Sequence, residues 1–376
     1  MNTHAQQETS QNDTKIEELE SIRGLAALLV VFFHIPKWNP TLDIRIINNG
    51  YLMVDLFFVL SGFVIYNAYV GKINSAKDLF RFQFLRFGRL YPVHIMFLIA
   101  FIFIEITRYL ALSKLGITIP DTKPFSENNL KAIFQHLFLI QAILPTNNAA
   151  TFNGPAWSIS VEFYTYLIFG AGIFLAEKKK NVLFSLLAFA SVLLLVSETT
   201  FGLKDFLRCL AGFFIGCLTA LATNKFKTNV PKYFSLMVFV AIALFLQLKT
   251  SKQYNISIYF LTAAMIASIV LSRNGYLNNI LNLKMLTWLG SVSYAIYMSH
   301  AAIIWVVIQA LRFVLKKPEM LIHGISTPQL SKTESLFAFV ILMIIVLSFS
   351  AFVHRFIEKP MREKSRRFAF SKLNND

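Results

Sequence analysis

The first apolar stretch of the chain contains two side chains that can do chemistry, Arg23 and His34. They are eleven residues apart, which in a helix turning about 100° per residue places them on nearly the same face, roughly 16 Å apart along the axis. Polar and ionised side chains are unfavourable inside a membrane and usually mark a function there. An arginine near one surface and a histidine deeper in the bilayer suggest chemistry carried across a membrane.

Two carboxylates are expected at a depth similar to that of His34. Asp55 and Glu162 each lie about one turn into an apolar stretch. A carboxylate can orient an imidazole and stabilise its protonated form, so either one is a candidate partner of His34 in acid/base catalysis. The alternative is that both carboxylates only stabilise the N-terminal ends of their helices and that His34 is structural.

Further polar residues recur in two other apolar stretches, with His300 expected near mid-membrane and Arg208 at the outer side. Ser293, Tyr297 and His300 share one helix face at spacings of four and seven, which makes them candidates for substrate binding, although a structural role for His300 stays open. Arg208 stands beside Asp205 at the start of another apolar stretch. It either contacts an acceptor or extends toward the membrane interface.

A basic segment precedes the third apolar stretch and contains Arg86 and Arg89. Such a segment binds lipid phosphate, or it binds the phosphates of a cytoplasmic ligand, for which the planar guanidinium is suited. Arg23, Arg86 and Arg89 are all expected near the inner surface. The sequence has no HxxxH motif, no cysteine cluster, no P-loop and no GxGxxG motif, so we expect no metal site.

The composition predicts an integral membrane protein. The 376 residues are 56% hydrophobic and only 15% charged, and 38 of them are Phe. The net charge of +16 does not point to nucleic acid, because the basic residues lie between apolar runs, as in loops that face anionic lipid and the cytoplasm. Cys209 and Cys217 are too far apart on one predicted helix to form a disulfide.

Hydrophobic periodicity predicts an all-α bundle of about ten transmembrane spans with both termini cytoplasmic. Residues 126–144 are expected to form an interfacial or re-entrant helix. The predicted organisation is a cytoplasmic tail (1–20), a transmembrane domain (21–360) and a basic cytoplasmic tail (361–376), with disorder over 1–14 and 368–376. The expected spans are 21–37, 51–70, 90–110, 157–176, 181–198, 206–223, 232–249, 256–273, 285–311 and 335–356.

Taken together, these segments resemble the bacterial acyltransferase family 3, whose members are integral-membrane O-acyltransferases. The resemblance covers nearly all of residues 18–362, and it rests on six short motifs found in the family's order. The motifs are Arg23-x10-His34, Val54 to Phe63, Arg86 to Pro92, Trp157 to Glu162 with Ile159 in place of Leu, Ser293 to His300, and Ile357 to Pro360.

The resemblance implies an acyl-CoA donor, with acetyl-CoA expected, on the cytoplasmic side of a bacterial inner membrane. It also implies an acceptor hydroxyl on a cell-surface carbohydrate or related molecule. Arg23, Arg86 and Arg89 would then hold the donor, and His34 would act as general base or acyl carrier, oriented by Glu162 or Asp55. This chain departs from many members at Phe163, where a second acidic residue is usual.

Two other readings of the same pattern stay open. A transporter or flippase of a lipid-linked glycan could use membrane-embedded His and Glu residues to relay protons, but the sequence lacks the inverted repeats and broken helix pairs of many transporters. A non-catalytic scaffold or sensor gives no reason for an arginine and a histidine on one helix face. The acceptor, the acyl group and the oligomeric state are not determined by the sequence.

Overall fold

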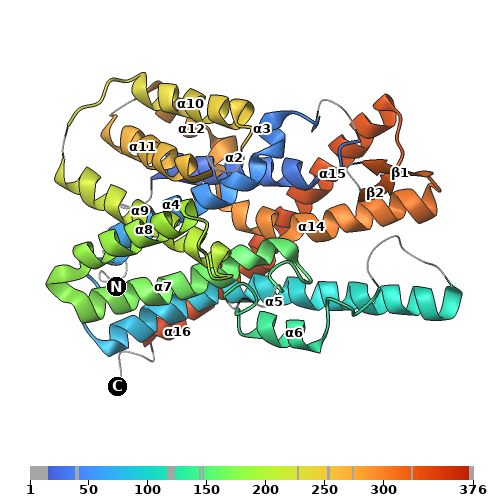
Figure 1. Ribbon diagram of the computed structural model, residues 1–376, viewed down its shortest axis with the longest axis horizontal. Helices are drawn as coiled ribbons and strands as arrows, with labels where there is room; N and C mark the ends of the chain where they lie inside the picture. The colour runs from blue at the N-terminus through green and yellow to red at the C-terminus, as the bar shows by residue number, and fades with distance from the viewer. Residues whose placement is uncertain are drawn as a thin grey trace, which may run out of the picture.

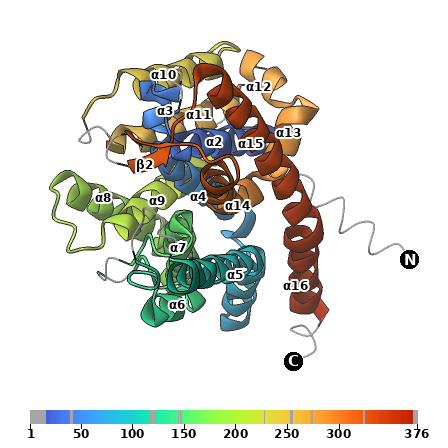
Figure 2. The ribbon, with the colours of Figure 1, turned by 90° about the vertical axis from the view of Figure 1, so that its right-hand side faces the viewer.

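The computed structural model is a helical bundle with one small β-hairpin, and it describes residues 16–38, 42–116, 123–143, 145, 148–226, 228–251, 255–272, 275–322 and 325–371. In Figures 1 and 2, α2, α4 and α14 lie between a group formed by α10, α11 and α12 and a group formed by α5, α6 and α7. The helices are α2 (Glu17–His34), α3 (Arg45–Asn48), α4 (Met53–Tyr69), α5 (Ala76–Leu115), α6 (Leu130–Leu137), α7 (Trp157–Ala176), α8 (Lys180–Val196), α9 (Lys204–Lys225), α10 (Phe234–Leu248), α11 (Ser257–Leu271), α12 (Tyr276–Leu281), α13 (Lys284–Ser291), α14 (Ser293–Gln309), α15 (Lys332–Val353) and α16 (Lys359–Ser371).

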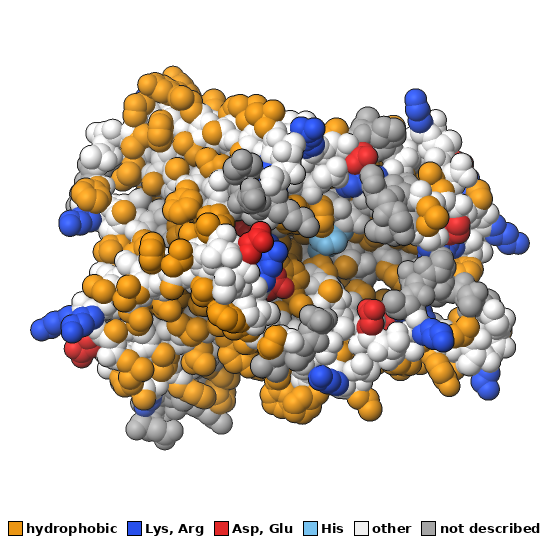
Figure 3. Space-filling view, in the orientation of Figure 1, with side chains coloured by type: hydrophobic (Ala, Val, Ile, Leu, Met, Phe, Trp, Pro, Cys, Tyr) orange, Lys and Arg blue, Asp and Glu red, His pale blue; other side chains and the backbone are white. Residues whose placement is uncertain are grey.

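The described residues contain six long apolar segments that could cross a membrane, and α10 and α11 are shorter apolar helices. One of the six, Gly154–Val196, holds both α7 and α8, which are joined by a short turn. Large apolar side chains stay exposed on many helices, as expected for lipid contact, and Figure 3 shows them spread over one face of the molecule. The protein is therefore a multi-pass membrane protein, with fewer long apolar segments than the ten spans that we predicted.

The first expected span corresponds to a helix of mixed character. α2 carries Glu17, Glu18, Glu20 and Arg23 in its first two turns, and it is not among the six long apolar segments. Its second half is apolar and largely buried up to the terminal residue, His34. The helix is thus set within the bundle rather than exposed to lipid all round, and its charged end lies opposite the end that carries the histidine.

The third span is much longer than predicted. α5 begins at Ala76, where the Ser75 side chain accepts a hydrogen bond from the backbone N–H of Asp78, and it continues through Pro92 to Leu115. The basic segment that we expected to precede a span at 90–110 is therefore itself helical. Arginine is a good helix former, and this half of α5 is supported by packing against α16.

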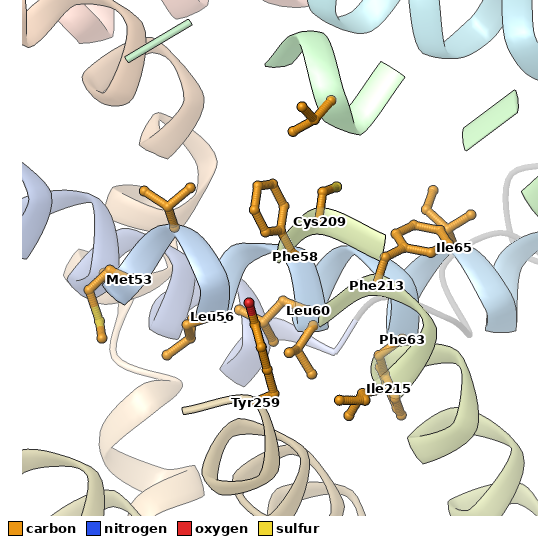
Figure 4. Close-up of a cluster of buried hydrophobic side chains, with 14 of the residues drawn as sticks. Met53, Leu56, Phe58, Leu60, Phe63, Ile65, Cys209, Phe213, Ile215 and Tyr259 are labelled. Atoms are coloured by element: carbon orange, nitrogen blue, oxygen red, sulfur yellow. The ribbon is translucent and has the colours of Figure 1, made fainter. Parts of the chain in front are cut away.

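The most intimate helix contact in the bundle joins α4 and α9 (Figure 4). A methyl group on Gly62 would overlap the carbonyl oxygen of Phe213, and one on Gly216 would overlap that of Val59. Glycine therefore allows the two backbones to touch, as small residues do at helix contacts in membranes. Phe58, Phe63 and Phe213 fill the space on either side, so the position of α4 relative to α9 is strongly constrained.

The segment expected to be one span at 285–311 is divided. α13 ends at Ser291, and α14 begins at Ser293 after Val292 takes a non-helical conformation. α13 packs closely on α2 because Gly290 lies against the backbone of Glu20. This break lets α14 leave α13 and run beside both α2 and α15.

Three further segments differ from the sequence prediction. Strands β1 (Glu319–Ile322) and β2 (Ile325–Pro328) form an antiparallel hairpin after a π-helical turn at Ala310–Val314, so the described part of the fold is not purely helical. The expected re-entrant helix is reduced to α6. The C-terminal segment continues as α16 up to Ser371, which corrects the expectation of disorder from 368, while 372–376 and 1–15 lie outside the described residues.

Candidate active site

Two histidines far apart in the sequence meet inside the bundle. His34 ends α2, and His300 lies on α14. The His300 Nε2 atom is 3.3 Å from the His34 Nδ1 atom, and the ring centroids are 4.8 Å apart. We did not predict this pairing, because the two histidines are 266 positions apart in the sequence.

The backbone around the pair assigns the ring protons. The His300 Nδ1 atom lies 3.2 Å from the Ile296 carbonyl oxygen, so it carries the proton and leaves the His300 Nε2 atom as an acceptor. The His34 Nδ1 atom lies 2.9 Å from the Val30 carbonyl oxygen, so its N–H faces two acceptors. This assignment leaves the His34 Nε2 atom with a free lone pair, which is what a general base or a nucleophile requires.

The two rings differ in their access to the outside. His300 is fully buried, whereas His34 is exposed. On the face drawn in Figure 3 the surface is hollowed near its centre, where acidic, basic and histidine side chains gather. The buried ring therefore supports an accessible one.

The wall behind His300 is built from hydrogen-bonded polar groups. Tyr297 lies one turn before His300, and its hydroxyl is 2.9 Å from the Ser158 Oγ atom and 2.8 Å from the Pro155 carbonyl oxygen. The Asn153 amide donates to the Met298 carbonyl at 3.0 Å, and its own oxygen is buried without a partner among the described residues. Asn153 adjoins the candidate site through Met298, and no spacing in the sequence pointed to it.

Ser293, the third residue of the predicted stripe, is the first residue of α14 and is buried. It lies two turns from His300. The stripe therefore runs from the break between α13 and α14 to the histidine pair.

Asp55 belongs to a second polar cluster, on α4. Its carboxylate accepts two hydrogen bonds from Arg208, at 3.1 Å from Nε and at 2.9 Å from an Nη atom, and a third from the Tyr259 hydroxyl at 3.0 Å. Arg208 also pairs with Asp205 at 3.1 Å and lies over the ring of Trp157. A bidentate pair of this kind is strong and directional.

Glu162 lies in a third cluster, between α4 and α7. Its Oε1 atom accepts hydrogen bonds from Ser61 at 2.6 Å and from Tyr166 at 2.5 Å. Among the described residues, no hydrogen bond joins His34 to Glu162 or to Asp55; the ring partners of His34 are Val30 and His300. The histidine that we expected beside a carboxylate is instead beside a second histidine.

The three candidate donor-binding arginines lie toward the end of the bundle that includes the start of α2 and α16. Arg23 is 3.6 Å from Glu20. Arg89 is half-buried and interacts electrostatically with Tyr166, Glu20 and Glu358. These interactions join α2 and α5 at one charged region.

Arg86 and Arg362 extend this charged region. Arg86 donates a hydrogen bond to the Tyr69 hydroxyl at 3.0 Å and lies over the Tyr166 ring, while its Nε–H is buried with no acceptor in the described part of the chain. Arg362, on α16, interacts with both Arg89 and Glu358. Arg362 was not among the predicted site residues, although it follows the Ile357 to Pro360 motif by two residues.

A cavity of about 820 Å³ adjoins the Asp55 cluster. It lies between α4, α9, α11 and the loop after α8, and His34 and His300 are not among its lining residues. The lining consists of Asp55, Leu195, Val196, Ser197, Glu198, Thr200, Lys204, Arg208, Asn255, Ile256 and Tyr259.

Comparison with known proteins gives a consistent family match. The family described as "Acyltransferase domain" matches residues 16–355. "Protein 2 in picA locus" of Rhizobium radiobacter is 33% identical over 49% of this chain and 94% of its own length. No solved structure matches the chain.

Two longer relatives carry names that specify an activity. "Putative peptidoglycan O-acetyltransferase YrhL" of Bacillus subtilis is 26% identical over 95% of this chain and 56% of its own length. "Peptidoglycan O-acetyltransferase OatA" of Listeria monocytogenes is 26% identical over 77% of this chain and 49% of its own length. The chain thus spans about half the length of these two relatives.

Proposed function

The chain belongs to the acyltransferase 3 family of membrane acyltransferases, and we propose that it transfers an acyl group from acyl-CoA to a hydroxyl of a cell-surface glycan or related acceptor. Acetyl is the expected group, because two of its relatives are named as O-acetyltransferases. The expected location is the bacterial inner membrane. The observation that carries the proposal is the accessible His34 imidazole, whose Nδ1–H faces two acceptors and whose Nε2 lone pair is free.

In the proposed step, the His34 Nε2 atom takes the proton of the acceptor hydroxyl as the oxygen attacks the thioester carbonyl. The tetrahedral intermediate then collapses, the carbon–sulfur bond breaks, and the departing CoA thiolate receives the proton from His34. The products are the acyl ester and free CoA, so atoms and charge balance. Base catalysis of this kind contributes about 10²–10⁴-fold.

His300 has a positioning role in this mechanism. Its Nε2 atom accepts from the His34 Nδ1–H, and its own ring is held by the Ile296 carbonyl. The Val30 carbonyl and His300 together keep His34 in the tautomer that exposes Nε2. The alternative route, in which His34 itself carries the acyl group, uses the same lone pair; hydroxylamine trapping of an acylated protein distinguishes the two.

Arg23, Arg86 and Arg89 are proposed to bind the phosphates of the donor at the cytoplasmic end. Supporting this assignment, the Arg86 Nε–H is buried without an acceptor among the described residues, and guanidinium groups match phosphate geometry. Arg362 adds a fourth guanidinium to the same charged region. Glu20 and Glu358 balance part of this charge when no donor is bound.

The proposal is tested with the full chain in proteoliposomes supplied with acetyl-CoA. Release of CoA thiol and mass spectrometry of surface glycans from cells with and without the protein should both report acyl transfer. Loss of the glycan itself, rather than of its acyl groups, would instead support a flippase.

The donor site has its own variant and control. Arg86→Gln should raise the KM for acetyl-CoA by about 10- to 100-fold, because one charge-assisted contact contributes about 1.5–3 kcal/mol. Arg81→Gln is the matched control on the same helix, since Arg81 faces Asp78 and Phe370 instead. An unchanged KM in Arg86→Gln would remove this residue from the donor site.

A further inference from the structure

The cavity beside Asp55 has a lining suited to a polyhydroxylated molecule. Around its wall are hydroxyl, amide, carboxylate and ammonium groups from Ser197, Thr200, Asn255, Glu198 and Lys204. Sugar-binding sites use such groups, placed so that donors and acceptors converge on a ligand. The volume of about 820 Å³ is within the range of small-molecule sites, roughly 300–1,000 Å³.

The charges of this cavity are balanced within the protein. Asp55 and Glu198 match Lys204 and Arg208 in number. Arg208 is further committed, because it donates to both Asp55 oxygens and to Asp205. An anionic ligand would therefore have to compete with two carboxylates for this guanidinium, whereas a neutral ligand would not.

The loop that lines one side of the cavity has an unusual backbone conformation. Glu198, which lines the cavity, and Phe201 both have positive φ angles, of 56° and 50°. Non-glycine residues in this region are strained by about 1–3 kcal/mol, and such strain gathers at binding sites. This loop joins α8 to α9 and forms one wall of the cavity.

A short chain of contacts connects the cavity to the histidine pair. Arg208 lies 4.7 Å above the Trp157 ring. The next residue, Ser158, bonds to Tyr297, whose ring centroid is 5.9 Å from that of His300. This path links the cavity wall to His300, while His34 itself is not among the lining residues.

We propose that this cavity is an acceptor subsite that binds an uncharged sugar adjacent to the unit being acylated and disfavours acidic or phosphorylated units. The inference rests on the proposed acyl transfer to a glycan and adds to it the class of acceptor. Hydroxyl groups of a neutral sugar can bond to Glu198, Asn255 and Thr200 without disturbing the Asp55–Arg208 pair. A uronate or phosphate would place a third anion beside Asp55 and Asp205.

The test fills the cavity and follows the acylated product. Thr200→Trp should lower the amount of acylated glycan in cells at least tenfold. The affinity of the purified variant for acetyl-CoA should stay within twofold of wild type, because the donor arginines and His34 are untouched. Thr199→Trp is the matched control: Thr199 is exposed in the same loop but is not among the lining residues, so this variant should acylate normally.

Mass spectrometry of the wild-type product supplies the second readout. The acylated unit should have a neutral sugar as its neighbour. Normal acylation by Thr200→Trp, or an acidic or phosphorylated neighbour, would overturn the subsite while leaving acyl transfer intact. If the wild type forms no acylated product and cleaves no acetyl-CoA, the proposed function fails, and the subsite fails with it.

Discussion

The Asp55 cluster on α4 and the His34 cluster on α2 differ in how many of their polar atoms are hydrogen-bonded. At Asp55, both carboxylate oxygens are occupied by Arg208 and Tyr259. At His34, one ring nitrogen faces two acceptors, and the other has none of the described hydrogen bonds. A saturated group is suited to holding helices together, whereas an accessible group with a free lone pair is suited to reaction.

The largest effect is expected at the histidine. His34→Ala should lower acyl transfer by about 10²–10⁴-fold. The free energy of unfolding should fall by only about 1 kcal/mol, because the ring is exposed and gives up little more than its hydrogen bonds to Val30 and His300. Acetyl transfer and thermal unfolding of the same detergent-solubilised sample measure both quantities. An active, normally expressed His34→Ala protein would end the proposed mechanism.

The opposite pattern is expected at the carboxylate. Asp55→Asn should lower the free energy of unfolding by about 3 kcal/mol, because it leaves Arg208 short of its main counter-charge. Adding Arg208→Gln should restore part of this loss, as expected when two residues act through each other. If Asp55→Asn is instead fully stable and inactive, Asp55 belongs to the catalytic group rather than to the structural one.

Replacing His300 should lower activity less than replacing His34. His300→Asn should lower kcat about tenfold, equivalent to about 1.4 kcal/mol, with little change in the KM for acetyl-CoA, because it removes one acceptor of the His34 N–H. Ser299→Ala is the control for a general packing defect in α14, since Ser299 is buried next to His300 and bonds to Ser350. Equal losses in both variants would argue against a positioning role.

The smallest expected effect is on stability and concerns His136, a buried histidine with a structural role. His136 in α6 is buried with its Nε2 atom 3.0 Å from the Thr151 hydroxyl, and burial, together with the nearby His94 ring, lowers the pKa of His136 to about 3. The unfolded chain takes up a proton below about pH 6.5, and the folded chain does so only near pH 3. Stability should therefore fall as the pH drops through this window.

Thermal unfolding at pH 7 and pH 5 tests this. The wild type should lose about 1 kcal/mol or more between the two values, and His136→Asn should lose less, since the replacement side chain does not titrate. Identical pH dependence in both proteins would show that His136 is not the responsible group.

The sequence located several helices well and others poorly, for identifiable reasons. The expected span at 157–176 coincides with α7, and that at 51–70 is close to α4, because both are uninterrupted apolar runs. Arg86 and Arg89 interrupt the apolar run of the third span, so the prediction began α5 fourteen residues too late. The break at Val292 lies in Gly290-Ser-Val-Ser293, where a glycine and two serines are a local signal for a break that the prediction passed over.

The candidate site shows the same division. Residue type and spacing singled out His34, His300, Asp55, Glu162 and Arg208 as unusual polar residues in apolar surroundings. They did not reveal which of these are neighbours: Asp55 joins Arg208, Glu162 joins Ser61 and Tyr166, and His34 joins His300. Asn153 and Arg362 are recognised only from their contacts in the structure, with Met298 and with Arg89 and Glu358.

Membrane insertion and the presence of reactive groups follow from local chemistry, because hydropathy adds up residue by residue along the chain. Hydrogen-bond partners do not follow in this way, since they depend on which helices touch and how closely. Here the Gly62 and Gly216 contacts bring α4 against α9 and thereby Asp55 toward Arg208, while the break before α14 allows His300 to reach His34. The long-range packing of the helices, rather than any motif, determines which polar groups have all their hydrogen bonds made and which keep a free lone pair.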